Sequence, residues 1–221
     1  AFDATGLDLK GAFTVSMGAD RPGTTVYTLA LSSEGVDSGL DDTASGANIL
    51  LYTNGNTVEG RVGGALGAVA FVIINVNGAL SLDQRSAVKH PVTTDADDQV
   101  DIADGTIFLK ATATDADNDV ASASLDIGAA LNFNDDGPSR NAATVSVRVE
   151  EDELPNGITD GDGFNTIATG SLASLVNFGA DGAGSFGFSL ASFVNPNITS
   201  GGTAVKWGVS ADGLTLVGYT G

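Results

Sequence analysis

The chain has 221 residues, of which 42% are hydrophobic and 17% are charged, and 28 acidic against nine basic side chains give a formal net charge of −19. This hydrophobic content is too high for a disordered chain, and the negative charge disfavours nucleic acid and anionic membrane surfaces as partners. The absence of cysteine excludes disulfides, thiol catalysis and thiolate zinc sites.

The predicted elements are strands throughout. Asp outnumbers Glu by 23 to 5 and there are 30 glycines, an excess of turn formers over helix formers that argues against helices. Short apolar runs with a period of two predict strands, which in chain order are residues 12–17, 24–31, 48–53, 57–62, 68–76, 106–114, 120–127, 143–150, 172–178, 185–190, 203–209 and 214–219. Residues 82–88, the one candidate helical turn, are interpreted as part of a loop.

The segments between these strands are typical of hairpin turns. Four pairs supply the positive φ angles that tight turns need, namely Asn54-Gly55, Asn77-Gly78, Asp104-Gly105 and Asp212-Gly213. Many short antiparallel strands at this spacing predict β-sandwiches. The longest apolar run, residues 65–76, is shorter than the roughly 18 residues of a membrane span, so we expect no membrane insertion.

The sequence contains one imperfect internal repeat. Met17-Gly18-Ala19-Asp20 recurs as Phe178-Gly179-Ala180-Asp181, and Thr57-Val58-Glu59-Gly60 recurs as Thr215-Leu216-Val217-Gly218. The matches keep their order at a spacing of about 160 residues, which is typical of a tandem array rather than of a solitary enzyme. Neighbouring repeats of the same polypeptide are therefore the expected partners.

A domain junction is predicted in residues 132–141, where the strand pattern stops and turn formers gather. The first domain would be residues 1–138 and the second residues 139–221, each a sandwich. A cut near residue 63, which would divide the first domain into two smaller sandwiches, stays open as an alternative.

The acidic residues are clumped along the chain, and clustered carboxylates repel one another unless they are solvated, partly protonated or bound to a cation. Calcium fits best, because it takes six to eight oxygen ligands in flexible geometry; magnesium fits less well, and transition metals are disfavoured by the single histidine. One calcium site at the junction is expected to draw on Asp115, Asp117, Asp119, Asp135, Asp136, Glu150, Glu151 and Asp152. The alternative is a set of solvated, Asp-rich turns.

Four segments resemble a known family. Residues 112–125, residues 133–138 and residues 149–155 contain Thr-Asp-Ala-Asp-Asn-Asp, Phe-Asn-Asp-Asp-Gly-Pro and Val-Glu-Glu-Asp-Glu-Leu-Pro, and the fourth segment is residues 213–221. The first two are similar to the repeat ends, and the last two to the start and middle of a repeat, of giant RTX-type adhesins that bacteria export by type I secretion. The resemblance implies immunoglobulin-like or cadherin-like sandwich repeats that are rigidified by calcium. It also implies a secreted protein at the bacterial cell surface, with a role in cell adhesion or biofilm formation.

These observations together predict a non-enzymatic, calcium-stabilised extender segment of a surface adhesin. His90 is the only histidine, and its expected position on an exposed loop offers no catalytic triad. Two alternatives stay open: a module that itself recognises a cell-surface glycan or protein, and an acidic glycosidase-like domain. One tryptophan and three tyrosines are few for a sugar-binding cleft.

Overall fold

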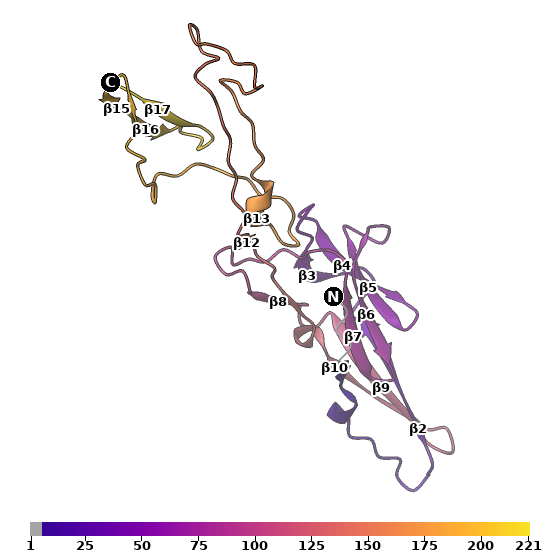
Figure 1. Ribbon diagram of the computed structural model, residues 1–221. Coiled ribbons are helices and arrows are strands. Elements are labelled where there is room, and N and C mark those ends of the chain that lie inside the picture. The colour runs from indigo at the N-terminus through magenta and orange to yellow at the C-terminus, as the bar shows by residue number, and fades with distance from the viewer. Residues whose placement is uncertain (1–5) are drawn as a thin grey trace. The chain divides into compact units, whose positions relative to one another are not determined.

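A computed structural model describes residues 6–221 and is almost entirely β (Figure 1). The regular elements in this range are strands and three short 3₁₀ turns, η1 (Lys10–Ala12), η2 (Gly128–Ala130) and η3 (Ala173–Leu175). The predicted β class is confirmed. Within the described range no helix has both the length and the apolar character needed to cross a membrane.

The chain forms two compact units. The first contains the residues up to Pro138 together with Gly179–Gly182, and the second contains Ser139–Phe178 and Ala183–Gly221. The sequence places a junction after residue 138 but gives no sign that Gly179–Gly182 belongs to the first unit. This short segment repeats the Gly-Ala-Asp motif of residues 18–20.

The larger sheet of the first unit has six strands in the order β1-β7-β6-β5-β4-β3, all antiparallel. Its strands are β1 (Leu7–Asp8), β3 (Val36–Asp41), β4 (Asn48–Asn54), β5 (Thr57–Val62), β6 (Val69–Val76) and β7 (Ala79–Gln84). Because β5 pairs with β6, a domain cut near residue 63 would divide a single sheet.

The smaller sheet of the first unit has three antiparallel strands in the order β10-β9-β2. These strands are β2 (Thr24–Leu31), β9 (Ile107–Thr114) and β10 (Val120–Asp126). A separate two-stranded pair joins β8 (Gln99–Asp101) to β11 (Asn132–Asn134). The turn between β9 and β10 holds the Asp-rich segment 115–119.

A single hydrophobic core joins the elements of the first unit. Both sheets contribute fully buried side chains, among them Leu51 and Phe71 of the larger sheet and Leu109 of the smaller one. The ring of Phe71 lies 4.9 Å from that of Phe133 in β11, measured between centroids. The apolar run of β6 is buried almost along its length, as expected for a strand inside a core.

The second unit has only short strand pairs. They are β12 (Ser139–Arg140) with β13 (Val176–Asn177), β14 (Thr199–Ser200) with β15 (Thr203–Ala204), and β16 (Lys206–Val209) with β17 (Leu216–Tyr219). No residue of this unit is fully buried in the described structure.

Several predicted strands are wrong. Residues 12–17, 143–150 and 185–190 contain no strand, and only two residues of 172–178 are extended, in β13. Conversely, the structure contains β3, β7 and β8, which the sequence analysis did not predict. The sequence of β3 is Val-Asp-Ser-Gly-Leu-Asp, which is too polar to be recognised as a strand from its pattern. Its pairing with β4 also contains a register shift between Asp37 and Asp41. The start of the expected loop 82–88 lies in β7.

Candidate functional site

Three carboxylates gather beside the turn between β9 and β10. One oxygen from each of Asp20, Asp115 and Asp117 lies within 4.8 Å of the others. Two oxygens bound to the same calcium ion at 2.3–2.6 Å can be no more than about 5 Å apart. The spacing of this cluster, called the Asp20 cluster below, therefore suits a shared divalent cation.

The turn that presents this cluster is closed by its own hydrogen bonds. The backbone N–H of Asp119 donates to Asp115 Oδ1 at 2.8 Å, and the backbone N–H of Asp115 donates to the Asp119 carbonyl at 3.1 Å. Asn118 takes a positive φ of 73°, which Asn tolerates better than most residues. These bonds hold Asp115 at the base of the turn.

Asp20 reaches the turn from a segment distant in sequence. The backbone N–H of Ala116 donates to the Asp20 carbonyl at 3.2 Å, which fixes the two segments side by side. Gly18, with φ of 61°, precedes Asp20 in the Gly-Ala-Asp motif. In the sequence this motif is recognisable only as a repeat, and no local pattern marks Asp20 as part of a cation site.

A second acidic cluster lies in the second unit. Oxygens of Glu150, Asp160 and Asp162 lie within 4.8 Å of one another. Asp160 Oδ1 accepts a hydrogen bond from the backbone N–H of Asp162 at 3.0 Å, and Glu150 also contacts the guanidinium of Arg148. The cationic side chain offsets part of the charge at this cluster, called the Glu150 cluster below.

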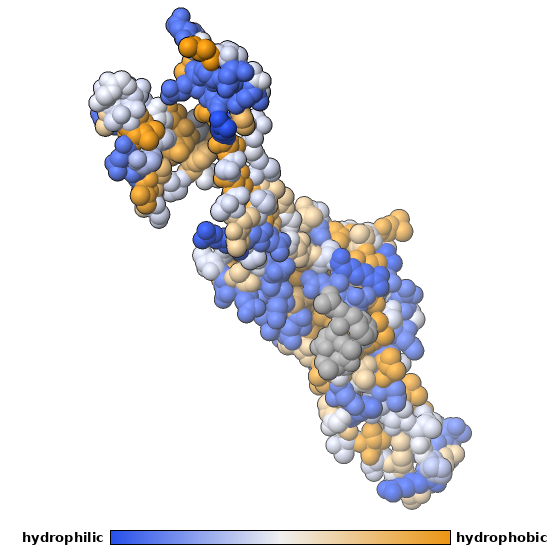
Figure 2. All heavy atoms as spheres, in the orientation of Figure 1, coloured by the Kyte–Doolittle hydropathy of each residue, from blue (hydrophilic) through white to orange (hydrophobic). Residues whose placement is uncertain are grey.

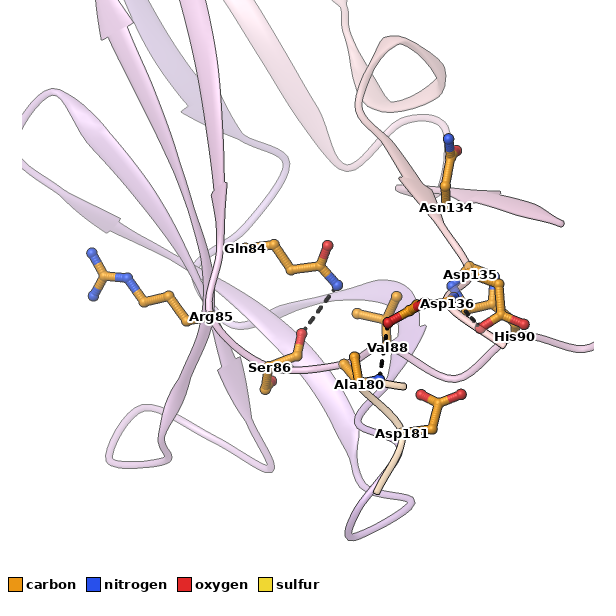
Figure 3. Close-up of a pocket in the computed structure, with 11 residues that line it drawn as sticks. Gln84, Arg85, Ser86, Val88, His90, Asn134, Asp135, Asp136, Ala180 and Asp181 are labelled. Carbon is orange, nitrogen blue, oxygen red and sulfur yellow. Dashed lines mark hydrogen bonds between the residues drawn. The ribbon is translucent and has the colours of Figure 1, made fainter. Parts of the chain in front are cut away.

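Asp135 and Asp136 line a cavity of about 320 Å³ in the first unit, together with His90 and Asp181 (Figure 3). Asp136 Oδ2 accepts a hydrogen bond from the backbone N–H of Ala180 at 3.1 Å. The backbone N–H of Asp135 donates to the Asp98 carbonyl at 3.0 Å. The second Gly-Ala-Asp motif thus also lies against an Asp-rich turn, although these carboxylates do not form one of the close groups found in the described residues.

The side chain of His90 is buried, although Lys89 and Pro91 on either side of it are exposed, as expected for this loop. Only 6% of its side chain is exposed, and its Nδ1 atom lies 3.5 Å from Asp98 Oδ1. Asp98 Oδ2 accepts a hydrogen bond from the backbone N–H of Val92 at 3.2 Å. His90 Nδ1 and Asp98 Oδ1 are both buried, and neither atom has a hydrogen-bond partner.

The structure separates the residues expected at one junctional site. Asp115 and Asp117 belong to the Asp20 cluster, whereas the carboxylate of Asp119 is outside it. Asp135 and Asp136 directly follow β11 and line the cavity beside His90 instead. In the second unit the carboxylate of Glu150 lies close to those of Asp160 and Asp162. The carboxylates of Glu151 and Asp152 belong to neither cluster of the described residues.

Both clusters consist of oxygen ligands alone. Hard cations such as calcium and magnesium prefer this donor set, and three carboxylates carry enough charge to attract a divalent ion. The fold and these clusters define a β protein with acidic groups able to hold such ions.

Residues 3–128 match the family model described as "Domain of unknown function (DUF5801)". Because the match covers more than half of the chain, the chain belongs to this family. No curated protein and no solved structure matches the chain.

Proposed function

We propose that this protein is a calcium-stabilised, non-enzymatic extender segment of a bacterial surface adhesin, built from immunoglobulin-like β-sandwich repeats. The Asp20 cluster is the observation that carries the proposal, because it unites two sequence-distant segments through carboxylates that repel one another without a cation. The resemblance of the Asp-rich segments to RTX-type adhesin repeats supports secretion and a place at the cell surface.

The proposed mechanism is mechanical. In the Asp20 cluster an ion would tie the segment before β2 to the turn after β9, and in the Glu150 cluster an ion would tie residue 150 to the loop around residue 161. A secreted chain without disulfides needs another means of stabilisation, and cation cross-links can supply it. Stiffened modules would then support adhesion at a distance from the cell.

The test is thermal unfolding of the chain in calcium and in chelator at matched ionic strength. Binding to the folded state alone adds about 2.7 kcal/mol at a hundredfold excess of ion over Kd, so the melting temperature should rise by several degrees in calcium. Magnesium at the same concentration should give a smaller rise. Superimposable melting curves in calcium and in chelator would disprove the proposal.

A matched pair of variants assigns the effect to a site. Asp20→Asn should remove a large part of the calcium-dependent rise, because it deletes a ligand charge from the Asp20 cluster. Asp97→Asn makes the same chemical change at an exposed residue outside both clusters, and should leave the rise intact. Equal losses in the two variants would indicate general charge screening instead of a site.

A further inference from the structure

The outer edge of β10 has no neighbouring strand among the described residues. β10 is an edge strand of the smaller sheet, whose order is β10-β9-β2. Its pairing with β9 contains no register shift, and residues 120–125 include neither a charged residue nor a proline. Charges, prolines and bulges are the usual protection of an edge strand against further pairing. The edge of β10 has none of them over these residues.

The hydrogen bonds of the smaller sheet show which backbone groups of β10 face outward. The N–H of Ile127 donates to the Ile107 carbonyl at 3.1 Å, and these two residues continue the register of β10 and β9. Hydrogen-bonded pairs alternate with pairs that exchange no bonds along an antiparallel ladder. The backbone N–H and C=O groups of Val120, Ser122 and Ser124 therefore face away from β9.

Residues 13–17 follow η1 and lie across a cavity from β10 (Figure 1). The cavity has a volume of about 320 Å³, and its walls include Phe13 and Val15 on one side and Ala121 and Ala123 on the other. Among the described residues, the backbone N–H groups of residues 14–17 have no hydrogen-bond partner. Unpaired backbone groups therefore border the cavity on both sides.

The two segments run antiparallel to each other. Residues 13–15 share the first cavity with residues 121–123, whereas Met17 shares a second, smaller cavity with Asp119 and Val120. The later residues of one segment thus lie beside the earlier residues of the other. The register that satisfies both cavities pairs Phe13 with Ala123, Thr14 with Ser122, Val15 with Ala121 and Ser16 with Val120.

This register matches the two faces of the smaller sheet. Opposite residues of an antiparallel pair lie on the same face, so Phe13 and Val15 would join the alanines on the face that the core covers. Thr14 and Ser16, which are exposed, would lie on the solvent face. Val15 is 40% exposed in the described structure, and Figure 2 shows apolar and weakly polar surface at this end of the first unit.

Alanines leave room for the side chains of the added strand. Tyr27, Ala111 and Ala123 form one row across β2, β9 and β10, and Phe13 would be the next residue of this row. The ring of Phe13 lies 5.8 Å from that of Tyr27, measured between centroids. Two methyl groups between the rings permit this contact across the row, which larger side chains would block.

We propose that residues 13–17 close onto the outer edge of β10 as a fourth strand of the smaller sheet and fill the cavity between them. In the closed state Thr14 and Ser16 exchange backbone hydrogen bonds with Ser122 and Val120. Val15 moves onto Ala121 and away from water. The new hydrogen bonds and the burial of Val15 favour closure, and the strand protects the edge of the sheet.

The Asp20 cluster controls this closure, a step that rests on the proposed function. Asp20 follows Met17 by three residues, and Asp115 and Asp117 lie in the turn directly before β10. Without a cation the three carboxylates repel one another, and a shared cation removes the repulsion. With Asp20 held beside the turn, only a short segment is left to order when the strand pairs. Calcium should therefore favour the closed state.

A pair of introduced cysteines tests the register. The chain contains no cysteine, so Val15→Cys combined with Ala121→Cys supplies the only two thiols. In the closed state their Cα atoms would be about 4.5 Å apart, a distance that a disulfide spans. Val15→Cys combined with Ser122→Cys is the matched control, because the side chain of Ser122 lies on the opposite face.

The rate of intramolecular disulfide formation is measured by mass spectrometry in a glutathione buffer. In calcium it should be at least about tenfold higher for the first pair than for the control pair, since only the first has the geometry of a disulfide. Equal rates for the two pairs would overturn the proposal.

Hydrogen exchange of the unmodified chain tests the same pairing without a cross-link. In the closed state the N–H groups of Thr14 and Ser16 bond to β10, whereas those of Val15 and Met17 face away from it. In calcium, after correction for intrinsic rates, Thr14 and Ser16 should exchange at least about tenfold more slowly than Val15 and Met17. Equal exchange of the four amides would contradict a fourth strand.

A comparison of calcium with chelator separates this proposal from the proposed function. Calcium should raise the rate of disulfide formation of the first pair and slow the exchange of Thr14 and Ser16. Asp20→Asn should reduce both effects, and Asp97→Asn should leave them intact. If calcium raises the melting temperature but changes neither rate, the proposed function stands and control of the strand by the Asp20 cluster is wrong.

Discussion

Asp20 is the residue of the candidate site that comes from a segment distant in sequence from the Asp-rich turn. The sequence gathers Asp115, Asp117 and Asp119 in one turn, yet the structure replaces Asp119 with Asp20. The carboxylate of Asp115 accepts a hydrogen bond from the backbone N–H of Asp119. Asp115 is therefore both a candidate cation ligand and a group that closes the turn. Local spacing therefore identifies the turn, and a distant segment completes the cluster.

The lowered pKa of Glu59 predicts that the free energy of unfolding of the first unit depends on pH. The side chain of Asn54 donates to Glu59 at 2.8 Å and, with the nearby guanidinium of Arg61, lowers the pKa of Glu59 below its ordinary value despite partial burial. A carboxyl with a lowered folded-state pKa stabilises the fold above its unfolded pKa, and this contribution is lost as the pH falls through the folded pKa.

Glu59→Gln should therefore lower the free energy of unfolding at pH 7 by about 1 kcal/mol and have little effect near pH 3. Urea denaturation at both pH values measures the difference. A loss of equal size at the two pH values would show that ionisation of Glu59 does not contribute.

At the scale of elements, the larger sheet depends on a close contact between β5 and β6. Gly60 provides the space in which the buried ring of Phe71 lies, and Phe71 in turn contacts Phe133. A glycine in a strand interior usually weakens the strand, but here it permits an aromatic contact between neighbouring strands.

Gly60→Ala should destabilise the first unit by about 1–3 kcal/mol, because the new methyl group would overlap the Phe71 ring. Gly11→Ala is the matched control: no atom lies within 4 Å of its Cβ position, and we expect a change within about 0.5 kcal/mol. Chemical denaturation measures both.

Phe71→Leu combined with Gly60→Ala tests the cause of this destabilisation. If the ring is responsible, the double variant should lose less stability than the sum of the two single variants. Additive losses would place the strain elsewhere.

At the scale of the whole molecule, the two units differ in how they are stabilised. The buried residues belong to the first unit, whereas the second has short strand pairs and exposed apolar side chains such as Ile158 and Val194. The hydrophobic effect therefore acts mainly on the first unit. Under the proposed function, cations bound at the Glu150 cluster would stabilise the second.

Native-state hydrogen exchange should resolve this difference. Amides of β4, β6 and β9 should exchange only through global unfolding of the first unit, and those of β16 and β17 should exchange at least about a hundredfold faster. Calcium should slow exchange in the loop around the Glu150 cluster. Uniform protection along the described chain would contradict this division.

The sequence by itself determined the β class, the turns and the main strands of the first unit. Alternation and Asn-Gly pairs are local signals, so β2 and β5 have the predicted bounds, and Asn77 and Gly78 take the positive φ angles of a tight turn between β6 and β7.

Only the tertiary structure decided the features that depend on distant segments. The polar strand β3 exists because β4 pairs with it, His90 is buried beside Asp98, and Asp20 joins the turn after β9 through a backbone hydrogen bond. Sequence reasoning missed them because pairing and burial are set by neighbours far along the chain, whereas propensity describes only the local backbone.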